Sequence, residues 1–250
     1  MLGATQATVR HWRRVDFAGR SVVLTGVGRE GQVGEAIASA FAELGARVFL
    51  VDRQESDARA RADALVAAGR RAAGLGVDLT DANGVAALAE RIRDATGGRV
   101  HALVHLAGGF TMSGPVVDSD PSLWSRQFAI NATTAYLASR AFLPMLRTTK
   151  GALVFFASEA VLPGARVAEM SAYAAAKGAL VGLMRAIAQE EAPRGVRANA
   201  VAPSSIRTAA NLAAMGPDAQ YVSREDVAKV VMWLCSEDAR VVNGQVIPVR

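Results

Sequence analysis

The sequence predicts an α/β protein with one domain, a doubly wound parallel sheet of about seven strands with helices on both faces. Apolar runs typical of strands buried on both faces alternate with segments whose apolar residues recur at helical spacing. No linker, low-complexity block or fixed-period repeat interrupts that alternation. The 250 residues are 51% hydrophobic and 20% charged, which excludes an intrinsically disordered chain. We expect an N-terminal arm at 1–17 and the domain at 18–250.

The first half of the chain opens with a continuous apolar run at 21–25, which predicts a buried strand. Apolar residues then recur at helical spacing over 33–44, and Gly45 ends that helix. The same reasoning predicts strands at 47–51, 72–77 and 100–106 and helices at 55–68 and 81–95.

The second half continues the pattern. We expect a helix over 122–146, with Pro144 near its end, and a long helix over 172–192 that stops at Pro193. The remaining expected elements are strands at 152–157, 196–201 and 245–249 and a helix at 224–236.

The charge of the chain does not indicate a nucleic-acid partner. The net charge is +5, but the 25 arginines and 3 lysines are spread along the whole chain rather than gathered in a binding stripe. The one cysteine, Cys235, excludes an internal disulfide and argues against a cysteine-based metal site, so we expect no metal.

The basic cluster at 10–14 is not followed by an apolar stretch of signal-peptide length. No run approaches the roughly 20 apolar residues that a membrane span needs. We therefore expect no membrane partner and a cytoplasmic location.

A glycine-rich turn follows the first expected strand. Gly26, Gly28 and Gly31 satisfy G-x-G-x-x-G, and the turn opens a helix within a βαβ unit. Glycine allows the sharp turn and the close approach of a pyrophosphate, while the helix offers free N–H groups and a positive dipole end. This context predicts a Rossmann-type dinucleotide site.

An acidic residue, Asp52, ends the second strand, 21 residues after Gly31. A carboxylate there accepts hydrogen bonds from a ribose 2′-OH and repels a 2′-phosphate, which favours NAD. Arg29 and Arg53 could hold a 2′-phosphate, so NADP stays possible. Asp78, after the third strand, is expected either to meet an adenine edge or to belong to the start of the next helix.

Tyr173 and Lys177 lie four residues apart, so both side chains leave one face of a helix. A nearby ammonium lowers the pKa of a tyrosine, which allows the hydroxyl to give or take a proton. Ser158 follows the fifth strand, at the sheet edge where ligands bind, and is either a substrate-orienting hydroxyl or a turn cap. Asn131 lies inside an expected helix, where its amide could bond backbone or organise a water chain to Lys177.

The chain resembles the short-chain dehydrogenase/reductase family over essentially residues 17–249. The stretches that carry the resemblance are the Thr25-Gly26 turn, Asp78-Leu79, Asn131, Ser158, Tyr173-x-x-x-Lys177 and Asn199-Ala200-Val201-Ala202-Pro203.

This resemblance implies an NAD(P)-dependent oxidoreductase that interconverts an alcohol and a carbonyl, with a small-molecule substrate. Tyr173 would be the acid/base and Lys177 would bind the nicotinamide ribose. Ser158 would orient the substrate and Asn131 would hold a relay water. It further implies a homodimer or homotetramer assembled through the helices near 122–146 and 172–192. The implied cofactor-binding residues are Gly26, Gly28, Gly31, Val33, Gly34, Asp52, Arg53, Asp78, Leu79, Ala107, Gly108, Tyr173, Lys177, Pro203, Ile206 and Thr208.

The sequence departs from the family pattern in places. The glycine turn is longer than usual, and after the fourth strand His105-Leu106-Ala107-Gly108 replaces the usual Asn-Asn-Ala-Gly. His105 either replaces an asparagine bond or is a buried, hydrogen-bonded histidine. The segment 204–223 is a short substrate lid, and Glu159 has no assigned role.

Two alternatives remain open. Ala107-Gly108-Gly109-Phe110 and the short lid resemble the dihydropteridine-reductase branch, which implies a pterin reductase. The second alternative is a member of the family that binds a nucleotide but is not catalytic. Phe110, Met112, Leu162, Met170, Met215 and Tyr221 are the candidates to line the substrate pocket.

Overall fold

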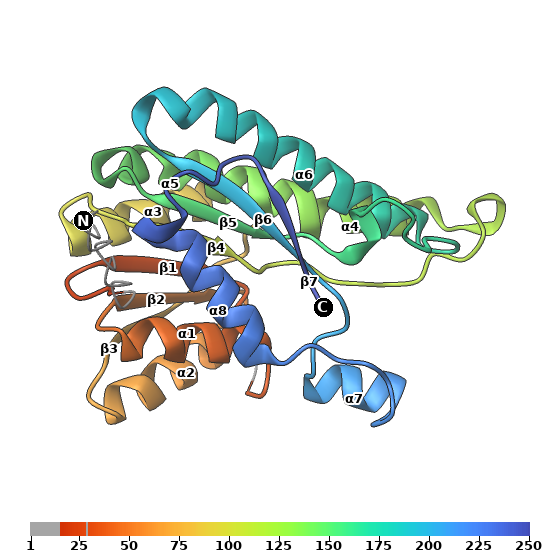
Figure 1. The fold of residues 1–250 in the computed structure, drawn as a ribbon, viewed down its shortest axis with the longest axis horizontal. Coiled ribbons are helices and arrows are strands. Elements are labelled where there is room, and N and C mark those ends of the chain that lie inside the picture. The colour runs from red at the N-terminus through yellow and green to blue at the C-terminus, as the bar shows by residue number, and fades with distance from the viewer. Residues whose placement is uncertain (1–15, 29) are drawn as a thin grey trace, which may run out of the picture.

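The computed structural model describes residues 16–28 and 30–250, and it has the predicted doubly wound architecture (Figure 1). Seven parallel strands form one sheet in the order β3-β2-β1-β4-β5-β6-β7. The expected arm lies outside the described residues except for its end. There Phe17 is fully buried, with its ring 4.7 Å from that of Phe41.

The strands are short, and the central residues of β1, β2, β4 and β5 are buried, as the apolar runs predict, whereas β3 at the edge of the sheet is only partly buried. Because β1 pairs with β2 on one side and with β4 on the other, the strand order reverses there. In open α/β sheets, ligands bind beyond the carboxyl ends of the strands at such a reversal. The strands are β1 (Ser21–Thr25), β2 (Arg47–Asp52), β3 (Arg71–Gly76), β4 (Ala102–His105), β5 (Ala152–Phe156), β6 (Arg197–Pro203) and β7 (Val246–Val249).

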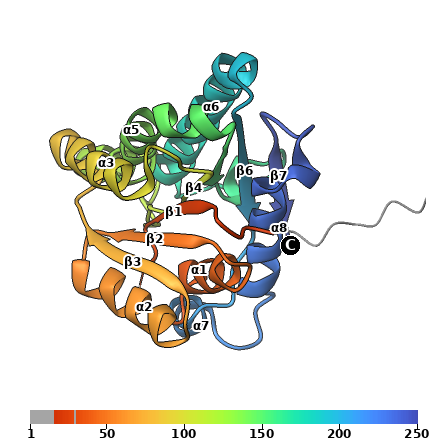
Figure 2. The ribbon, with the colours of Figure 1, turned by 90° about the vertical axis from the view of Figure 1, so that its left-hand side faces the viewer.

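Helices cover both faces of the sheet (Figures 1 and 2). One apolar cluster joins α1 and α8 to one face, through residues such as Phe41 and Val231. A second joins α3, α5 and α6 to the other, through residues such as Ile92, Phe142 and Met184. The helices are α1 (Val33–Glu43), α2 (Glu55–Ala67), α3 (Ala82–Thr96), α4 (Pro121–Phe128), α5 (Thr134–Thr149), α6 (Ser171–Glu191), α7 (Ala209–Met215) and α8 (Arg224–Cys235).

The expected helix over 122–146 is helical throughout, but it is not one regular α-helix. It consists of α4, a π-helical segment at Ala129–Thr133, and α5, which runs on to Thr149. A π-helical turn carries an extra residue, a change that apolar spacing does not reveal. The other strands and long helices end within two residues of the expected positions.

The segment expected as a lid contains α7, which apolar spacing also does not indicate. Thr208 caps this helix by accepting a hydrogen bond from the Asn211 N–H at 3.2 Å. In the part of the chain that the structure describes, no helix has the length and hydropathy of a membrane span.

Candidate active site

The glycine-rich turn after β1 is shaped by contact with the segment after β4. Gly26 has φ +73°, and a Cβ at this position would lie 2.4 Å from the backbone of Ala107. Any side chain here would therefore push the two segments apart, and both segments border the reversal in strand order. This is a packing reason for glycine, in addition to the predicted approach of a pyrophosphate.

Two carboxylates hold the rest of the turn. The Gly28 N–H donates to Asp52 Oδ2 at 2.9 Å, which joins the turn to the end of β2. The Gly31 N–H donates to Glu35 Oε2 at 2.8 Å, and Glu35 also forms an ion pair of 2.8 Å with Arg61. Glu35 was not singled out in the sequence, because an acid in the first turn of a helix is ordinary.

The amino end of α1 is open to an anionic group. Its cap residue, Gln32, makes no side-chain hydrogen bond to the first-turn N–H groups. Gly34, in that first turn, packs so closely that a Cβ would lie 2.3 Å from the Val27 carbonyl oxygen. Free N–H groups and the helix dipole favour a phosphate at this position, and so the turn fits a dinucleotide. Arg29, the loop cation weighed for a 2′-phosphate, lies outside the described residues.

Two acidic residues follow β3, Asp78 and Asp81, and the sequence left open whether Asp78 belongs to the start of the next helix. Asp78 Oδ1 accepts hydrogen bonds from Thr80 N at 2.8 Å and Thr80 Oγ1 at 2.7 Å, which lower the pKa of its carboxyl. Asp81, not Asp78, caps α3, by accepting from the Asn83 N–H. Leu79 is buried, and Arg53 is exposed with a charge that also lowers the pKa of Asp78. The adenine contact of Asp78 stays a prediction.

Asn131 occupies the π-helical segment and is fully buried. Its Nδ2 donates to the Gly109 carbonyl and to the Gln127 backbone and side-chain oxygens, each at 3.0 Å, and its Oδ1 accepts from the Gly109 N–H at 3.2 Å. Of the two expected tasks, bonding to backbone is therefore the one seen. A Cβ at Gly108 would lie 2.5 Å from Asn131 Oδ1 and 3.1 Å from Lys177 Nζ, so the three residues are packed together.

Lys177 is 4% exposed, and its Nζ donates to the Phe156 carbonyl oxygen at 2.7 Å. Burial lowers the pKa of this ammonium to about 8. An ammonium has three donors, and this is the one hydrogen bond that it makes within the described residues. The remaining donors and the cavity beside them fit a hydroxyl-bearing ligand such as a ribose.

Tyr173 differs from the expectation in one respect. Burial raises the pKa of its phenol, the Glu159 carboxylate raises it further, and interaction with the Ser158 hydroxyl opposes the rise. Lys177 is not among the groups that shift this pKa; its Nζ donates to the Phe156 carbonyl and lies 5.9 Å from the centre of the tyrosine ring. In this structure the phenol is therefore held in its protonated form.

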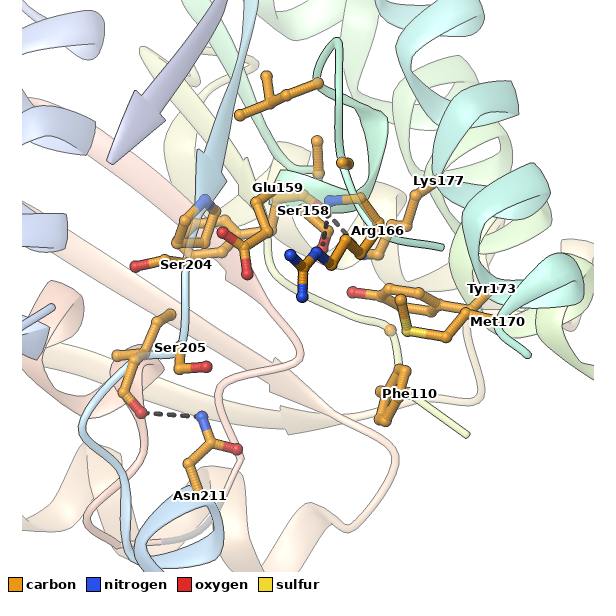
Figure 3. A pocket seen from close by; sticks show the side chains of 18 of the residues that line it. Phe110, Ser158, Glu159, Arg166, Met170, Tyr173, Lys177, Ser204, Ser205 and Asn211 are labelled. Atoms are coloured by element: carbon orange, nitrogen blue, oxygen red, sulfur yellow. Dashed lines mark hydrogen bonds between the residues drawn. The ribbon is translucent and has the colours of Figure 1, made fainter. Parts of the chain in front are cut away.

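Of the two roles that the sequence left open for Ser158, the turn cap is seen and the orienting of a substrate stays a prediction. Ser158 Oγ accepts a hydrogen bond from the Ala160 N–H at 3.2 Å and caps the short helix Glu159–Val161. The same hydroxyl faces a cavity, together with Tyr173 and Lys177 (Figure 3).

His105 is a buried, hydrogen-bonded histidine. Its Nδ1 lies 2.8 Å from Thr25 Oγ1 and its Nε2 lies 3.3 Å from Thr134 Oγ1. Burial, with a smaller effect from the Lys177 charge, lowers its pKa to about 3. The imidazole is therefore neutral and ties β1 to β4 and to the start of α5.

One cavity of about 770 Å³ gathers the predicted catalytic side chains apart from Asn131, which supports it from behind. Of the expected cofactor residues, Gly108, Pro203 and Ile206 line it, while the glycine turn and Asp52 lie outside it. Phe110 packs edge-on against the Tyr173 ring at 5.0 Å. The expected pocket residues Leu162, Met170 and Met215 also line the cavity, Met112 does not, and Tyr221 lines an adjoining hollow.

Three charged residues of this cavity were missed as site residues by the sequence reasoning. Glu159 and Arg166 come from the segment between β5 and α6, and Arg250 follows β7. Their only sequence signal is position, since each lies beyond the carboxyl end of a strand or on a loop that follows one.

Comparison with known proteins gives a consistent result. Residues 26–250 match the family model described as Enoyl-(Acyl carrier protein) reductase. The chain is 37% identical to 2-(S)-hydroxypropyl-CoM dehydrogenase 3 of Xanthobacter autotrophicus, over 89% of this chain and 92% of that protein. It is 35% identical to a protein of the same organism named inactive 2-(S)-hydroxypropyl-CoM dehydrogenase 2, over 85% and 97%.

Solved structures are similar as well. The structure of a short-chain type dehydrogenase/reductase from Mycobacterium ulcerans superposes with a TM-score of 0.86 at 28% identity. The match covers 94% of this chain and 89% of that one, so it extends across the sheet, the helices and the cavity.

Proposed function

Because the chain belongs to the short-chain dehydrogenase/reductase family, we propose that it interconverts an alcohol and a carbonyl with a nicotinamide cofactor, NAD in preference to NADP. The observation that carries this proposal is the shared cavity. Tyr173, Lys177 and Ser158 line it together with Gly108 and Pro203, beside the reversal in strand order.

The residues of the chain supply position and a proton. The nicotinamide, when bound, supplies or accepts the hydride. The Ser158 hydroxyl orients the substrate oxygen, and the Tyr173 hydroxyl transfers the proton to or from it. When the cofactor is bound, the free donors of Lys177 would hold the nicotinamide ribose, and Asn131 fixes the Gly109 backbone.

The raised pKa of Tyr173 favours one direction of reaction. A protonated phenol can donate to the oxygen of a carbonyl as the hydride arrives at the carbon. Oxidation of an alcohol needs the phenolate, and burial and the Glu159 charge both oppose it. Alcohol oxidation should therefore need a higher pH than carbonyl reduction at this site.

Replacing Tyr173 tests the proposal directly. Tyr173→Phe should lower turnover by about 10²–10⁴-fold, because the proton donor is lost, and should leave cofactor affinity nearly unchanged. A screen of alcohols and ketones with both cofactors, followed at the absorbance band of reduced nicotinamide, provides the activity. Calorimetry provides the affinity, and unchanged turnover would remove Tyr173 from the mechanism.

The same experiment separates the enzyme from a non-catalytic relative. The name of the inactive Xanthobacter protein shows that similarity at 35% identity includes a member without activity. A non-catalytic protein would bind a nucleotide but turn over no substrate in the screen. The compared proteins add nothing to the pterin-reductase alternative.

The preference for NAD rests on Asp52, which ends β2 and accepts the Gly28 N–H. We predict that NADH binds more tightly than NADPH, because the carboxylate repels a 2′-phosphate. Asp52→Ala should narrow the difference by about tenfold, the equivalent of 1.4 kcal/mol. Tighter binding of NADPH by the parent would mean that arginine side chains, and not Asp52, determine the cofactor preference.

Assembly through the helices at 122–146 and 172–192 stays a prediction.

A further inference from the structure

The cavity beside Tyr173 has an excess of positive charge. Among its lining side chains are three cations, Lys177, Arg166 and Arg250, and one carboxylate, Glu159. Lys177 is buried and bonded to the Phe156 carbonyl, so it belongs to the catalytic machinery. The other charged residues lie nearer solvent and are unexplained by alcohol–carbonyl chemistry.

Arg166 is the cation left without a partner. Glu159 lines the same cavity but is not within ion-pair distance of Arg166. Across residues 16–28 and 30–250, Arg166 makes neither an ion pair nor a side-chain hydrogen bond. Figure 3 shows its guanidinium pointing into the space that the Tyr173 hydroxyl also faces.

The loop that carries Arg166 is held in place. The Ser113 N–H donates to the Glu169 carbonyl oxygen at 2.7 Å, the Gly114 N–H donates at 3.1 Å, and Ser113 Oγ donates at 3.0 Å. Glu169 itself has φ +62°, a conformation that costs a residue with a side chain on the order of 1 kcal/mol. These three hydrogen bonds hold the backbone of the loop that carries the exposed Arg166 side chain.

Glu159 and Arg250 also line an adjoining hollow of about 600 Å³, with Ser204 and Tyr221 on its walls. Glu159 therefore faces two spaces, and neither Arg166 nor Arg250 forms an ion pair with it within the described residues. A guanidinium without a carboxylate partner, aimed into a cavity, favours an anion, to which it can donate two parallel hydrogen bonds.

We propose that Arg166 recognises an anionic group of the substrate, so that the substrate class is a ketone or alcohol bearing a carboxylate, sulfonate or phosphate. This inference rests on the proposed function. The reacting carbon lies at Ser158 and Tyr173, and the anion lies at Arg166 in the same cavity. The apolar side chains of Phe110, Leu162 and Met170 pack against the carbon chain between them.

A matched pair of substrates tests the charge. The holoenzyme is assayed with 4-oxopentanoate and with its neutral methyl ester, which has the same reacting ketone. 2-Oxopropanesulfonate and dihydroxyacetone phosphate serve as sulfonate and phosphate arms, to find which anion is preferred. We expect kcat/KM to be higher for the preferred anion than for the ester, and a parent enzyme that prefers the ester would overturn the proposal.

Arg166→Gln keeps much of the length of the side chain but removes the charge. It should raise KM for the anionic ketone by about 10- to 100-fold, because a charged hydrogen bond is lost, and change KM for the ester by less than about threefold. Arg166→Lys should recover part of the loss. Arg99→Gln is the control, since Arg99 is exposed and does not line the cavity. An equal loss on both substrates would show a structural effect and overturn the inference.

Failure of the proposed function is distinguishable from failure of this inference. If no ketone is turned over, the calorimetric affinity of the parent protein for 4-oxopentanoate still tests the subsite. Arg166→Gln should then weaken that binding by about tenfold or more, whereas Arg99→Gln should not. Equal affinity of the parent and Arg166→Gln would overturn the anionic subsite whether or not the protein is an enzyme.

Discussion

The two sides of the cavity beside Tyr173 are built differently. On the buried wall, formed by Gly108, Gly109, Asn131, Phe156 and Lys177, the polar side chains are hydrogen-bonded to backbone and almost fully removed from solvent. On the open wall, formed by residues 159–170 and 204–221, Glu159 and Arg166 are exposed. We infer that the buried wall carries the reaction, because its side chains are held in fixed positions. The open wall determines which substrate binds, because charged residues there can be substituted with little loss of stability.

The buried wall should be the more sensitive to substitution, and Lys177 should show the largest effect. Lys177→Met should lower turnover by about 10²-fold or more, because the ribose-binding donors are lost from beside the proton donor. Its fold should persist at neutral pH, because removing a buried charge also removes a desolvation penalty. Steady-state kinetics with circular dichroism as the folding control check this, and retained turnover would contradict it.

Because Lys177 titrates, its contribution to the unfolding free energy should depend on pH. The pKa of Lys177 in the folded state, about 8, lies below the ordinary value of 10.5, so the unfolded state binds more protons between these values. The unfolding free energy of the parent relative to Lys177→Met should therefore rise from pH 8 to about 10.5 and stay level below pH 8. Urea unfolding across this range measures it, and a difference independent of pH would contradict the burial of the ammonium.

Asn131 should be the next most sensitive position. Asn131→Ala removes the hydrogen bonds to Gly109 and Gln127, leaves buried groups unpaired, and should lower the unfolding free energy by about 1–3 kcal/mol. Asn83→Ala, at an exposed position in α3, is the matched control and should change it by less than about 0.5 kcal/mol. Equal effects of the two substitutions in urea unfolding would mean that the π-helical segment is not held by this amide.

Glu159, on the open wall, should respond with the smallest change of these positions, a shift of the pH profile rather than a loss of stability. Glu159→Gln should shift the pH profile of alcohol oxidation to lower pH, by less than about one unit, because its charge raises the pKa of Tyr173. Glu169→Gln, on the same loop but outside the cavity, should leave the profile in place. A shift to higher pH, or none, would show that the carboxylate does not act on the phenol.

The difference between local spacing and long-range contacts explains which parts of the molecule could be predicted from the sequence. Apolar alternation determined the sheet, and the spacing of Tyr173 and Lys177 placed both side chains in one cavity, because a helix brings residues four apart onto one face. The glycine turn, with Asp52 at the end of β2, could also be predicted from the sequence, because glycine is needed where two backbone segments lie in close contact.

Tertiary structure alone decided three things. Burial raises the pKa of Tyr173, and no spacing reveals how deeply the phenol is buried or that Lys177 donates to the Phe156 carbonyl. The π-helical segment at Asn131 depends on partners from Gly109, 22 residues away. Arg166 lines the cavity from a loop whose Glu169 carbonyl accepts a hydrogen bond from Ser113, 56 residues away. The spacing of residues along the chain reveals helices, strands and the positions where the backbone requires glycine. Burial and long-range contacts determine the electrostatics of a site, and both exist only once the chain has folded.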